Sequence, residues 1–277
     1  MKDKFVLAAI QASPIYFDRQ ACTDKACELI AEAGAEGADL AAFGETWIPG
    51  YPFFAFKEVG AERWRAGEIY LDQAVSIPGP ETDQLCAAAK AAAVDVIISV
   101  AELDQRTRGT IYCTSLAISK DGRILGKHRK IKPTFQERMV WGEGSGGDFN
   151  VYERPYGRVS ALNCWEHQMV LPSYALMAQG TEVHVAAWPW GDPETAPEPP
   201  ISVWPRHELL SRAFAAQGSC YVIAVGAVLD EACIQSNFKD MAVERSGSSL
   251  IIDPRGEVVA RAPIGEQSIL LHEADRS

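Results

Sequence analysis

The sequence lacks the features that accompany nucleic-acid or membrane binding. Its 26 Lys and Arg are outnumbered by 37 Asp and Glu, and a net charge of −11 would repel a phosphate backbone. The apolar run at 221–229 is far shorter than the roughly 20 residues that cross a bilayer. The amino-terminal residues lack the long apolar region and small-residue cleavage site of a signal peptide. We therefore expect a cytoplasmic protein that binds neither nucleic acid nor membrane.

Metal and dinucleotide signals are also missing. The seven cysteines include no Cys-x-x-Cys pair, and no histidine spacing suggests a tetrahedral zinc site. The run GEGSGG at 142–147 satisfies G-x-G-x-x-G, but it neither follows a predicted strand nor opens a predicted helix. We therefore predict no metal and no cofactor. Most of the cysteines are expected to be free thiols that fill the core.

Short apolar runs rich in β-branched residues predict a series of buried strands. Ala-rich stretches with helical spacing lie between several of them, and we expect two of these helices to begin near Thr23 and Thr82. The runs that we interpret as strands are 5–10, 39–43, 94–101, 159–163, 182–187 and 221–226.

Two hairpins interrupt the alternation of strand and helix. KDGR at 120–123 and PRGE at 254–257 each place a Gly-containing turn between strand-like runs, which predicts antiparallel pairing. The sheets are therefore mixed. We predict a single α/β domain over 1–277, built from two mixed sheets packed face to face with helices outside; one wide sheet is the alternative.

Cys164, in NCWEH at 163–167, has surroundings that distinguish it from the other cysteines. A predicted strand ends at Asn163 and helical spacing follows, which resembles the strand–nucleophile–helix turn that exposes a reactive side chain. We expect the helix amino terminus to favour the thiolate, and the amide of Trp165 to face the negative charge that develops on an attacked substrate. His167 is the nearest histidine that could serve as a base, but it lies on the far side of the bend, and no orienting Asp or Asn is evident for the other four histidines.

Two further segments carry candidate polar groups. Glu45 follows an apolar strand and precedes an aromatic, proline-rich loop, where poor solvation would raise the pKa of its carboxyl toward that of a general base. Lys130 lies in a basic run, and strand alternation would place it on the same face as His128 and Lys132, with Pro133 ending the strand. A solvated sheet edge is the alternative interpretation of this basic run.

The three segments together resemble the nitrilase branch of the carbon–nitrogen hydrolases. FGETWIPGYP is similar to the glutamate segment of that family, HRKIKPTFQERMVWGEG to its lysine segment, and NCWEH to its cysteine segment, in the same order and over nearly the whole chain. The resemblance implies an αββα sandwich with Cys164 as nucleophile, Glu45 as general base and Lys130 as stabilising cation. It also suggests Glu137 as a fourth polar residue that orients Lys130 or water.

The implied reaction is hydrolysis of a small-molecule nitrile to the acid and ammonia through a thioimidate and a thioester on Cys164. An amidase or cyanide-hydrolysing relative is the nearest alternative, and a non-catalytic binding protein with the same fold is a more distant one. Trp165, Trp188 and Tyr51 are candidates for substrate binding. The aromatic residues around the glutamate segment and in the Pro- and Trp-rich stretch 188–205 could line an apolar pocket or simply pack in the core.

Two departures from the family pattern affect these expectations. Gly44 stands where proline usually precedes the glutamate, which we expect to loosen the backbone at that point. The sequence also ends at Ser277, without the carboxy-terminal extension that helps many nitrilases to build spirals. We therefore expect a homodimer or another small homo-oligomer.

Overall fold

A computed structural model describes residues 2–190, 206–239 and 247–276. Its strands form two six-stranded sheets, with the orders β12-β1-β2-β3-β4-β5 and β11-β10-β9-β8-β7-β6. The first sheet contains β1 (Lys4–Gln11), β2 (Leu40–Phe43), β3 (Asp95–Leu103), β4 (Ile111–Ser119), β5 (Arg123–Arg129) and β12 (Ser268–Asp275). The second contains β6 (Tyr152–Arg154), β7 (Gly157–Asn163), β8 (Val183–Trp188), β9 (Tyr221–Gly226), β10 (Leu250–Ile252) and β11 (Val258–Arg261).

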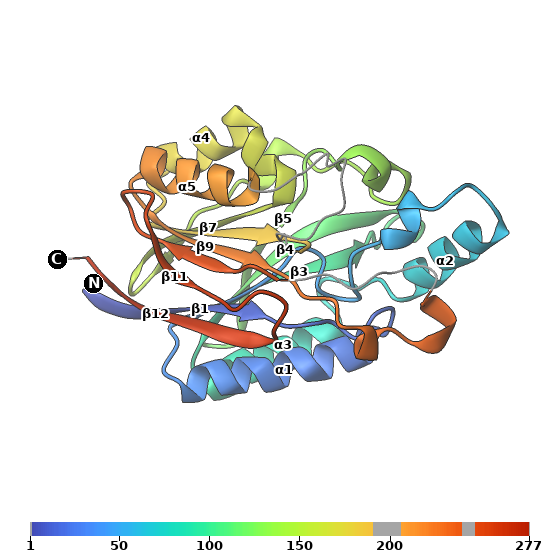
Figure 1. Cartoon of the computed structure of the whole chain (residues 1–277), viewed down its shortest axis with the longest axis horizontal. Helices are drawn as coiled ribbons and strands as arrows, with labels where there is room; N and C mark the ends of the chain where they lie inside the picture. Colours follow the sequence, from blue (N-terminus) through green and yellow to red (C-terminus); the bar gives the residue numbers. More distant parts are fainter. Residues whose placement is uncertain (1, 191–205, 240–246, 277) are drawn as a thin grey trace.

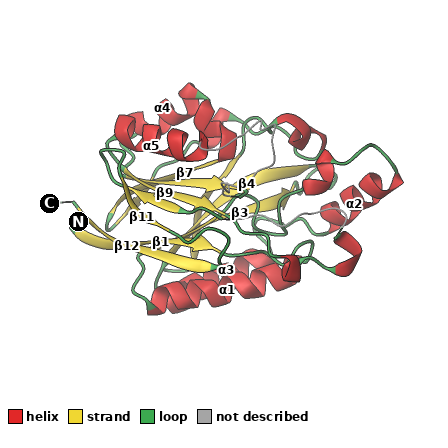
Figure 2. Cartoon of the chain, viewed as in Figure 1, coloured by secondary structure: helices red, strands yellow, loops and turns green. Residues whose placement is uncertain are grey.

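The helices cover the outer faces of the two sheets (Figures 1 and 2). α1 (Arg19–Ala35) and α3 (Pro80–Ala92) pack on the first sheet, while α4 (Val170–Ala178) and α5 (Arg206–Gly218) pack on the second. α2 (Ala61–Asp72) lies beyond one end of the sheets. The predicted αββα sandwich of two mixed sheets is therefore confirmed, and the single wide sheet is wrong.

Strand alternation explains the layers. In β1, Phe5 and Leu7 point into the core between the sheets, whereas Ala8 and Ile10 face the core under α1 and α3. Because both faces of the central strands are buried, these strands have continuous apolar sequences rather than alternating ones. That property is what made them recognisable in the sequence.

Each sheet is parallel at its centre and antiparallel at its edges. β1, β2 and β3 run parallel, as do β7, β8 and β9, while both predicted hairpins, β4–β5 and β10–β11, are antiparallel. Parallel strands bring their carboxyl ends to a common edge. The loop that follows β2 also meets the second sheet, because the amide of Glu45 donates to the carbonyl of Trp188 at the end of β8.

Both predicted helices are present, but each begins before its predicted cap residue. α1 begins at Arg19, and Asp18 caps it by accepting a hydrogen bond from the amide of Ala21, so Thr23 lies one turn inside. α3 begins at Pro80, whose ring suits the first helical position. Thr82 instead contributes a capping-box contact, because its Oγ1 accepts from the amide of Gly79. Both shifts add polar first turns that the apolar spacing does not reveal.

Candidate active site

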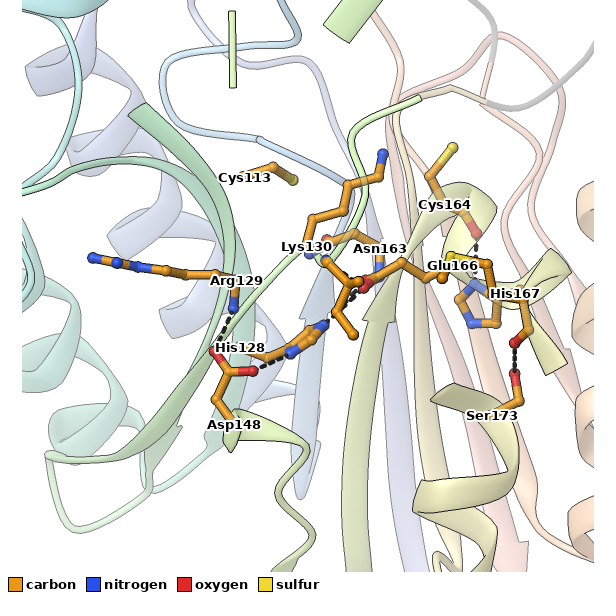
Figure 3. Close-up of polar contacts among 12 residues, drawn as sticks. Cys113, His128, Arg129, Lys130, Asp148, Asn163, Cys164, Glu166, His167 and Ser173 are labelled. Carbon is orange, nitrogen blue, oxygen red and sulfur yellow. Dashed lines mark hydrogen bonds and ion pairs between the residues drawn. The ribbon is translucent and has the colours of Figure 1, made fainter. Parts of the chain in front are cut away.

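Three chain segments that end strands of the two sheets bring their polar side chains together. Glu45 lies two residues after β2, Lys130 immediately follows β5, and Cys164 immediately follows β7. All three are almost completely buried, with 1%, 1% and 3% of their surface exposed. Figure 3 shows the side chains of Lys130 and Cys164 pointing toward the same side of the sheets.

Lys130 lies between two carboxylates. Its Nζ is 2.7 Å from Oε1 of Glu45 and 2.7 Å from Oε2 of Glu137, and none of these side chains is more than 2% exposed. Burial opposes the charged form of the lysine, but Glu137 and Glu45 outweigh it and raise the pKa of Lys130 well above its usual value. Lys130 is therefore a fixed ammonium ion inside the protein.

The prediction from strand alternation is correct for Lys130 only in part. β5 ends at Arg129, and the Lys130 amide still donates to the carbonyl of Cys113 at 2.8 Å before the chain turns away. Lys132 does not share the buried face, because its side chain is 50% exposed and pairs with Glu143 at the surface. The expectation that the strand continues to Pro133 was wrong, since the pairing with β4 stops earlier.

Glu45 meets the requirement for a poorly solvated acid. Burial raises the pKa of Glu45 to about 8, with Lys130 opposing this shift and Glu137 adding to it. Its Oε1 contacts Lys130 and the thiol of Cys113, at 2.7 and 3.6 Å. Its Oε2 is buried and has no hydrogen-bond partner among the described residues. This oxygen is therefore the one available for proton transfer.

Gly44 packs tightly just before this glutamate. A Cβ atom at Gly44 would lie 2.8 Å from the carbonyl oxygen of Trp188 and 2.9 Å from the Cβ of Ala227. The next amide, that of Glu45, donates to the same Trp188 carbonyl at 3.1 Å. The glycine thus permits close contact with the end of β8, and a larger residue would have to push the two segments apart.

Cys164 occupies a sharp turn. Its φ of 50° lies in the left-handed region, which is costly for a residue with a side chain and typical of nucleophile turns. The carbonyl of Cys164 accepts a hydrogen bond from Nδ1 of His167 at 2.7 Å. His167 thereby holds the backbone of the turn and directs Nδ1 to the carbonyl rather than to the sulfur.

The expected effect of a helix on the thiol was wrong. Only a five-residue 3₁₀ segment, Cys164–Gln168, follows the turn, and α4 begins later, at Val170. Burial, followed by the charge of Glu45, raises the pKa of the Cys164 thiol well above its usual value, although Lys130 and the amide of Trp165 oppose this. The resting group is therefore a thiol, and its reaction requires a base.

The candidate substrate-binding residues lie in different environments. Tyr51 is 5% exposed and donates its hydroxyl to Oε1 of Glu137 at 2.6 Å, so it supports the carboxylate that holds Lys130. Trp188 is buried, stacks on His167 and donates from Nε1 to Oγ of Ser211 at 3.3 Å. Trp165 is half-buried and packs against the core under α4 and α5. Contact of these residues with substrate stays a prediction.

Other aromatic residues build a wall beside the glutamate segment. Trp190 packs against Tyr51 and Phe53, with ring centroids 5.3 and 5.5 Å apart, and Trp141 lies 5.4 Å from Nζ of Lys130. Residues 191–205, most of the Pro- and Trp-rich stretch, lie outside the described residues. A cavity of about 10 Å³ lies beside Glu45, which is about enough for one water molecule.

The sequence interpretation missed a chain of charged groups next to these residues. Nδ1 of His128 lies 2.9 Å from Asp148, and its Nε2 lies 2.9 Å from Glu166, so this histidine does have orienting acids. Asp148 follows the glycine-rich run 142–147, in which the amide of Gly144 donates to the carbonyl of Lys130. That run therefore packs against the lysine segment. Glu166, two residues after Cys164, was the available signal, because a buried acid needs a partner.

Two features typical of other classes of protein are missing from the described residues. No group of three or more His, Cys, Asp and Glu side chains in them is placed to hold a metal ion. Among the helices described, none has the length and apolar character needed to span a membrane.

The site combines a buried thiol, a carboxyl with a free oxygen and a fixed cation. Such a set can remove a proton from sulfur, return it to a leaving group and stabilise negative charge near the reacting carbon. It is suited to attack on a carbon–nitrogen multiple bond or an amide by sulfur. The same geometry serves both substrates.

Comparisons with known proteins agree with this chemistry. The chain is 47% identical over 270 residues to "Nitrilase 2" from an unknown prokaryotic organism, covering 95% of this chain and 81% of that protein. It is 34% identical to an aliphatic nitrilase of Rhodococcus rhodochrous, covering 99% of this chain and 75% of the relative. A carbon–nitrogen hydrolase structure from Helicobacter pylori G27 has the same fold, with a TM-score of 0.77 at 22% identity over 99% of this chain and 90% of that one. The profile described as carbon–nitrogen hydrolase matches residues 6–277, and the chain belongs to that family.

Proposed function

We propose that the protein is a nitrilase that hydrolyses an organic nitrile to the carboxylic acid and ammonia. The observation that carries the proposal is the buried Lys130 ammonium, held 2.7 Å from both Glu45 and Glu137 beside the left-handed turn of Cys164. Similarity to nitrilases over nearly the whole of this chain supports the choice of nitrile over amide as substrate.

The first half of the reaction forms a carbon–sulfur bond. The free Oε2 of Glu45 removes the proton from Cys164, whose sulfur attacks the nitrile carbon. The electron pair displaced onto nitrogen takes up that proton, which gives a thioimidate. Lys130 and the Trp165 amide stabilise the negative charge that develops on nitrogen.

The second half consumes two water molecules. Glu45 removes a proton from the first water as its oxygen adds to the thioimidate carbon, and the nitrogen is protonated and leaves as ammonia. The resulting thioester is hydrolysed by a second water, which releases the acid and returns the proton to sulfur. The small cavity beside Glu45 supports this use of water. If the tetrahedral intermediate expels sulfur instead of ammonia, the product is the amide.

Glu137 has a positioning role in this scheme. It holds Lys130 through one oxygen, and the other accepts the hydroxyl of Tyr51 at 2.6 Å. The same oxygen that contacts Lys130 also accepts the amide of Thr134, also at 2.6 Å. We expect Glu137→Gln to change the turnover rate and the acid-to-amide ratio. A variant with both quantities unchanged would remove Glu137 from the mechanism.

We also propose that the protein forms a homodimer or another small homo-oligomer. Three apolar side chains of α4 support this, because Val170, Leu171 and Tyr174 are 77%, 78% and 66% exposed. Light scattering tests the assembly, and long filaments would contradict it.

The test of the activity measures ammonia release from matched nitriles and amides of aliphatic, aromatic and arylacetonitrile types. We expect release from at least one nitrile that exceeds release from its amide, and no turnover by Cys164→Ala. Mass spectrometry after a rapid quench should find the covalent adduct on Cys164. Cys86→Ala is the matched control, because Cys86 lies on α3 away from the site and should keep full activity.

Faster turnover of the amide than of the nitrile would favour an amidase. An adduct mainly on Cys113, the other buried thiol next to Glu45, would overturn the assignment of the nucleophile. Failure of every nitrile and amide, with Cys164 unreactive to iodoacetamide, would point to a binding protein.

A further inference from the structure

One buried carboxylate connects the segment of Lys130 with the segment of Cys164. Glu166 is 1% exposed, and its Oε1 accepts the amide of Ile131 at 2.9 Å, directly after Lys130. Its Oε2 accepts the amide of Asn163 at 3.0 Å, directly before Cys164. The first amide lies just after β5 of one sheet and the second ends β7 of the other, so Glu166 fixes one end of β7 relative to the chain that leaves β5.

His128 supplies the positive charge that this carboxylate needs. Its Nε2 lies 2.9 Å from Oε1 of Glu166 and its Nδ1 lies 2.9 Å from Oδ1 of Asp148 (Figure 3). Carboxylates only accept hydrogen bonds, so both ring nitrogens must donate and the ring is an imidazolium. Burial opposes this charge, but Asp148 and Glu166 raise the pKa of His128 to about 9. Phe149 stacks on the ring.

The Asp148 end of this group of charged residues also contacts the segment of Lys130. Oδ2 of Asp148 accepts the amide of Arg129 at 3.0 Å. The backbone amides on both sides of Lys130, those of Arg129 and Ile131, are therefore held by the two carboxylates that contact His128. Lysine has a flexible four-carbon stem, and fixing its backbone reduces the freedom with which Nζ can leave Glu45 and Glu137.

We propose that Asp148, His128 and Glu166 form a positioning unit that sets the geometry of Lys130 relative to Cys164. This role rests on the proposed function, since it assumes that the two residues act on one substrate. Misplacement of a catalytic group by about 1 Å can cost on the order of 10²-fold in rate, even when the fold is intact. None of the three residues needs to contact the substrate.

The first test is Glu166→Gln, which preserves shape but replaces one accepting oxygen with a donor. The amide of either Ile131 or Asn163 then loses its acceptor, and we expect kcat to fall by about 10²-fold while KM changes much less. The rate of Cys164 alkylation by iodoacetamide should fall as well. Glu143→Gln is the control on the neighbouring surface pair with Lys132, and it should leave both rates within twofold.

The second test is Asp148→Asn, which affects the charge of His128 from its more exposed side. The charged groups that contact the ring are Asp148 and, on the turn after β7, Glu166. Tyr152 on β6, whose pKa burial raises to about 12, interacts with Asp148 rather than with the ring. Lys127 and Arg129 pair with Glu102 instead. Loss of one carboxylate lowers the pKa of His128, so the alkaline limb of the kcat profile should move to lower pH. A purely structural role would leave that limb in place.

The outcomes separate this proposal from the proposed function. If Glu166→Gln folds, and its kcat and its rate of Cys164 alkylation both remain within twofold of the wild type, the positioning role is overturned. An unmoved alkaline limb in Asp148→Asn would overturn the part played by the charge of His128, and this variant serves alone if Glu166→Gln does not fold. If the wild type hydrolyses no nitrile, slower alkylation of Cys164 in Glu166→Gln still supports positioning, and an equal rate contradicts it.

Discussion

Two histidines flank the Cys164 turn. They are similarly buried, but His128 is charged and His167 is neutral. On one side, both ring nitrogens of His128 contact carboxylates. On the other, His167 contacts the carbonyl of Cys164 and the ring of His184, and no carboxylate of the described residues forms an ion pair with it. Burial disfavours the imidazolium at both sites, yet it prevails only for His167, whose pKa falls to about 4. The partners rather than the degree of burial determine which histidine is charged.

On the neutral side, that of His167, the hydrogen bonds form a chain in which each donor and acceptor is determined. Because His167 donates from Nδ1 to the Cys164 carbonyl, its Nε2 must accept from Nε2 of His184 at 2.9 Å. Nδ1 of His184 then accepts from Oγ of Ser160 at 2.7 Å. This side fixes the backbone of Cys164 without charge, whereas the side with His128 fixes it through ions. We expect the charged side to be more costly to disrupt.

The largest effect is expected from removing Lys130, the cation that the side with His128 positions. Lys130→Met leaves Glu45 and Glu137 buried without their common partner. We expect kcat/KM to fall by about 10³-fold or more, and the free energy of unfolding to fall by about 3–5 kcal/mol. Ammonia release and urea unfolding measure the two effects.

Lys132→Met is the matched control for that variant. It removes a lysine two residues away, whose surface pair with Glu143 is worth about 0–1 kcal/mol. Activity should remain within twofold of the wild type. A Lys130→Met enzyme that retained a tenth of the activity would show that the site does not depend on this charge.

The next test removes one histidine from each side. His128→Leu leaves Glu166 as a buried carboxylate without its cation, and we expect a loss of about 3–5 kcal/mol in the free energy of unfolding. His167→Leu leaves the carbonyl of Cys164 without its donor, which should cost about 1–3 kcal/mol. Urea unfolding at pH 7 gives both values. Equal losses, or a larger loss at His167, would contradict the proposed difference between the sides.

The free energy of unfolding should fall at high pH because of His128 and at low pH because of His167, which gives the pH profile an alkaline limb and an acid limb. The pKa of His128 is raised from 6.5 to about 9, so its stabilisation is complete below pH 6.5 and is lost as the pH rises through 9. The pKa of His167 is lowered from 6.5 to about 4, so stability falls as the pH drops from 6.5 through 4. Each limb should amount to about 3 kcal/mol in the free energy of unfolding.

Variants of single histidines show which residue causes each limb of the pH profile. Urea unfolding between pH 4 and 10 should show a smaller alkaline limb in His128→Leu and a smaller acid limb in His167→Leu. The acid limb also contains a contribution of the same sign from His184, whose pKa burial lowers well below its usual value. An alkaline limb that is unchanged in His128→Leu would show that His128 is not the titrating group.

The sequence was sufficient for the layers of the fold, and less so for the details of the helices. Central strands such as β3 and β9 are continuous apolar runs, because they are buried on both faces, and their bounds were predicted to within a few residues. α2 was not predicted at all. Only Ala66 and Tyr70 of its side chains are buried, which leaves it without a clear apolar stripe.

The sequence supplied candidate site residues but not their arrangement, and their catalytic roles stay predictions. Glu45, Lys130 and Cys164 were identified because their segments resemble a known family, whereas the 2.7 Å contact between Glu45 and Lys130 depends on how β2 and β5 lie within one sheet. The partners of His128 lie 20 and 38 residues away, so no local spacing could reveal them. Long-range pairing of that kind is set by the fold.

The smallest effect is expected at the outer end of the neutral chain. Ser160→Ala removes the hydroxyl that donates to Nδ1 of His184, but His167 can keep its bond to the Cys164 carbonyl. We expect a loss of about 1 kcal/mol in the free energy of unfolding, with kcat within twofold of the wild type and its pH limbs in place. Asp148→Asn, at the outer end of the charged chain, should instead move the alkaline limb of kcat. A shifted limb in Ser160→Ala would mean that the neutral chain also affects the group that sets this limb, because the loss of a hydrogen bond can itself change a pKa.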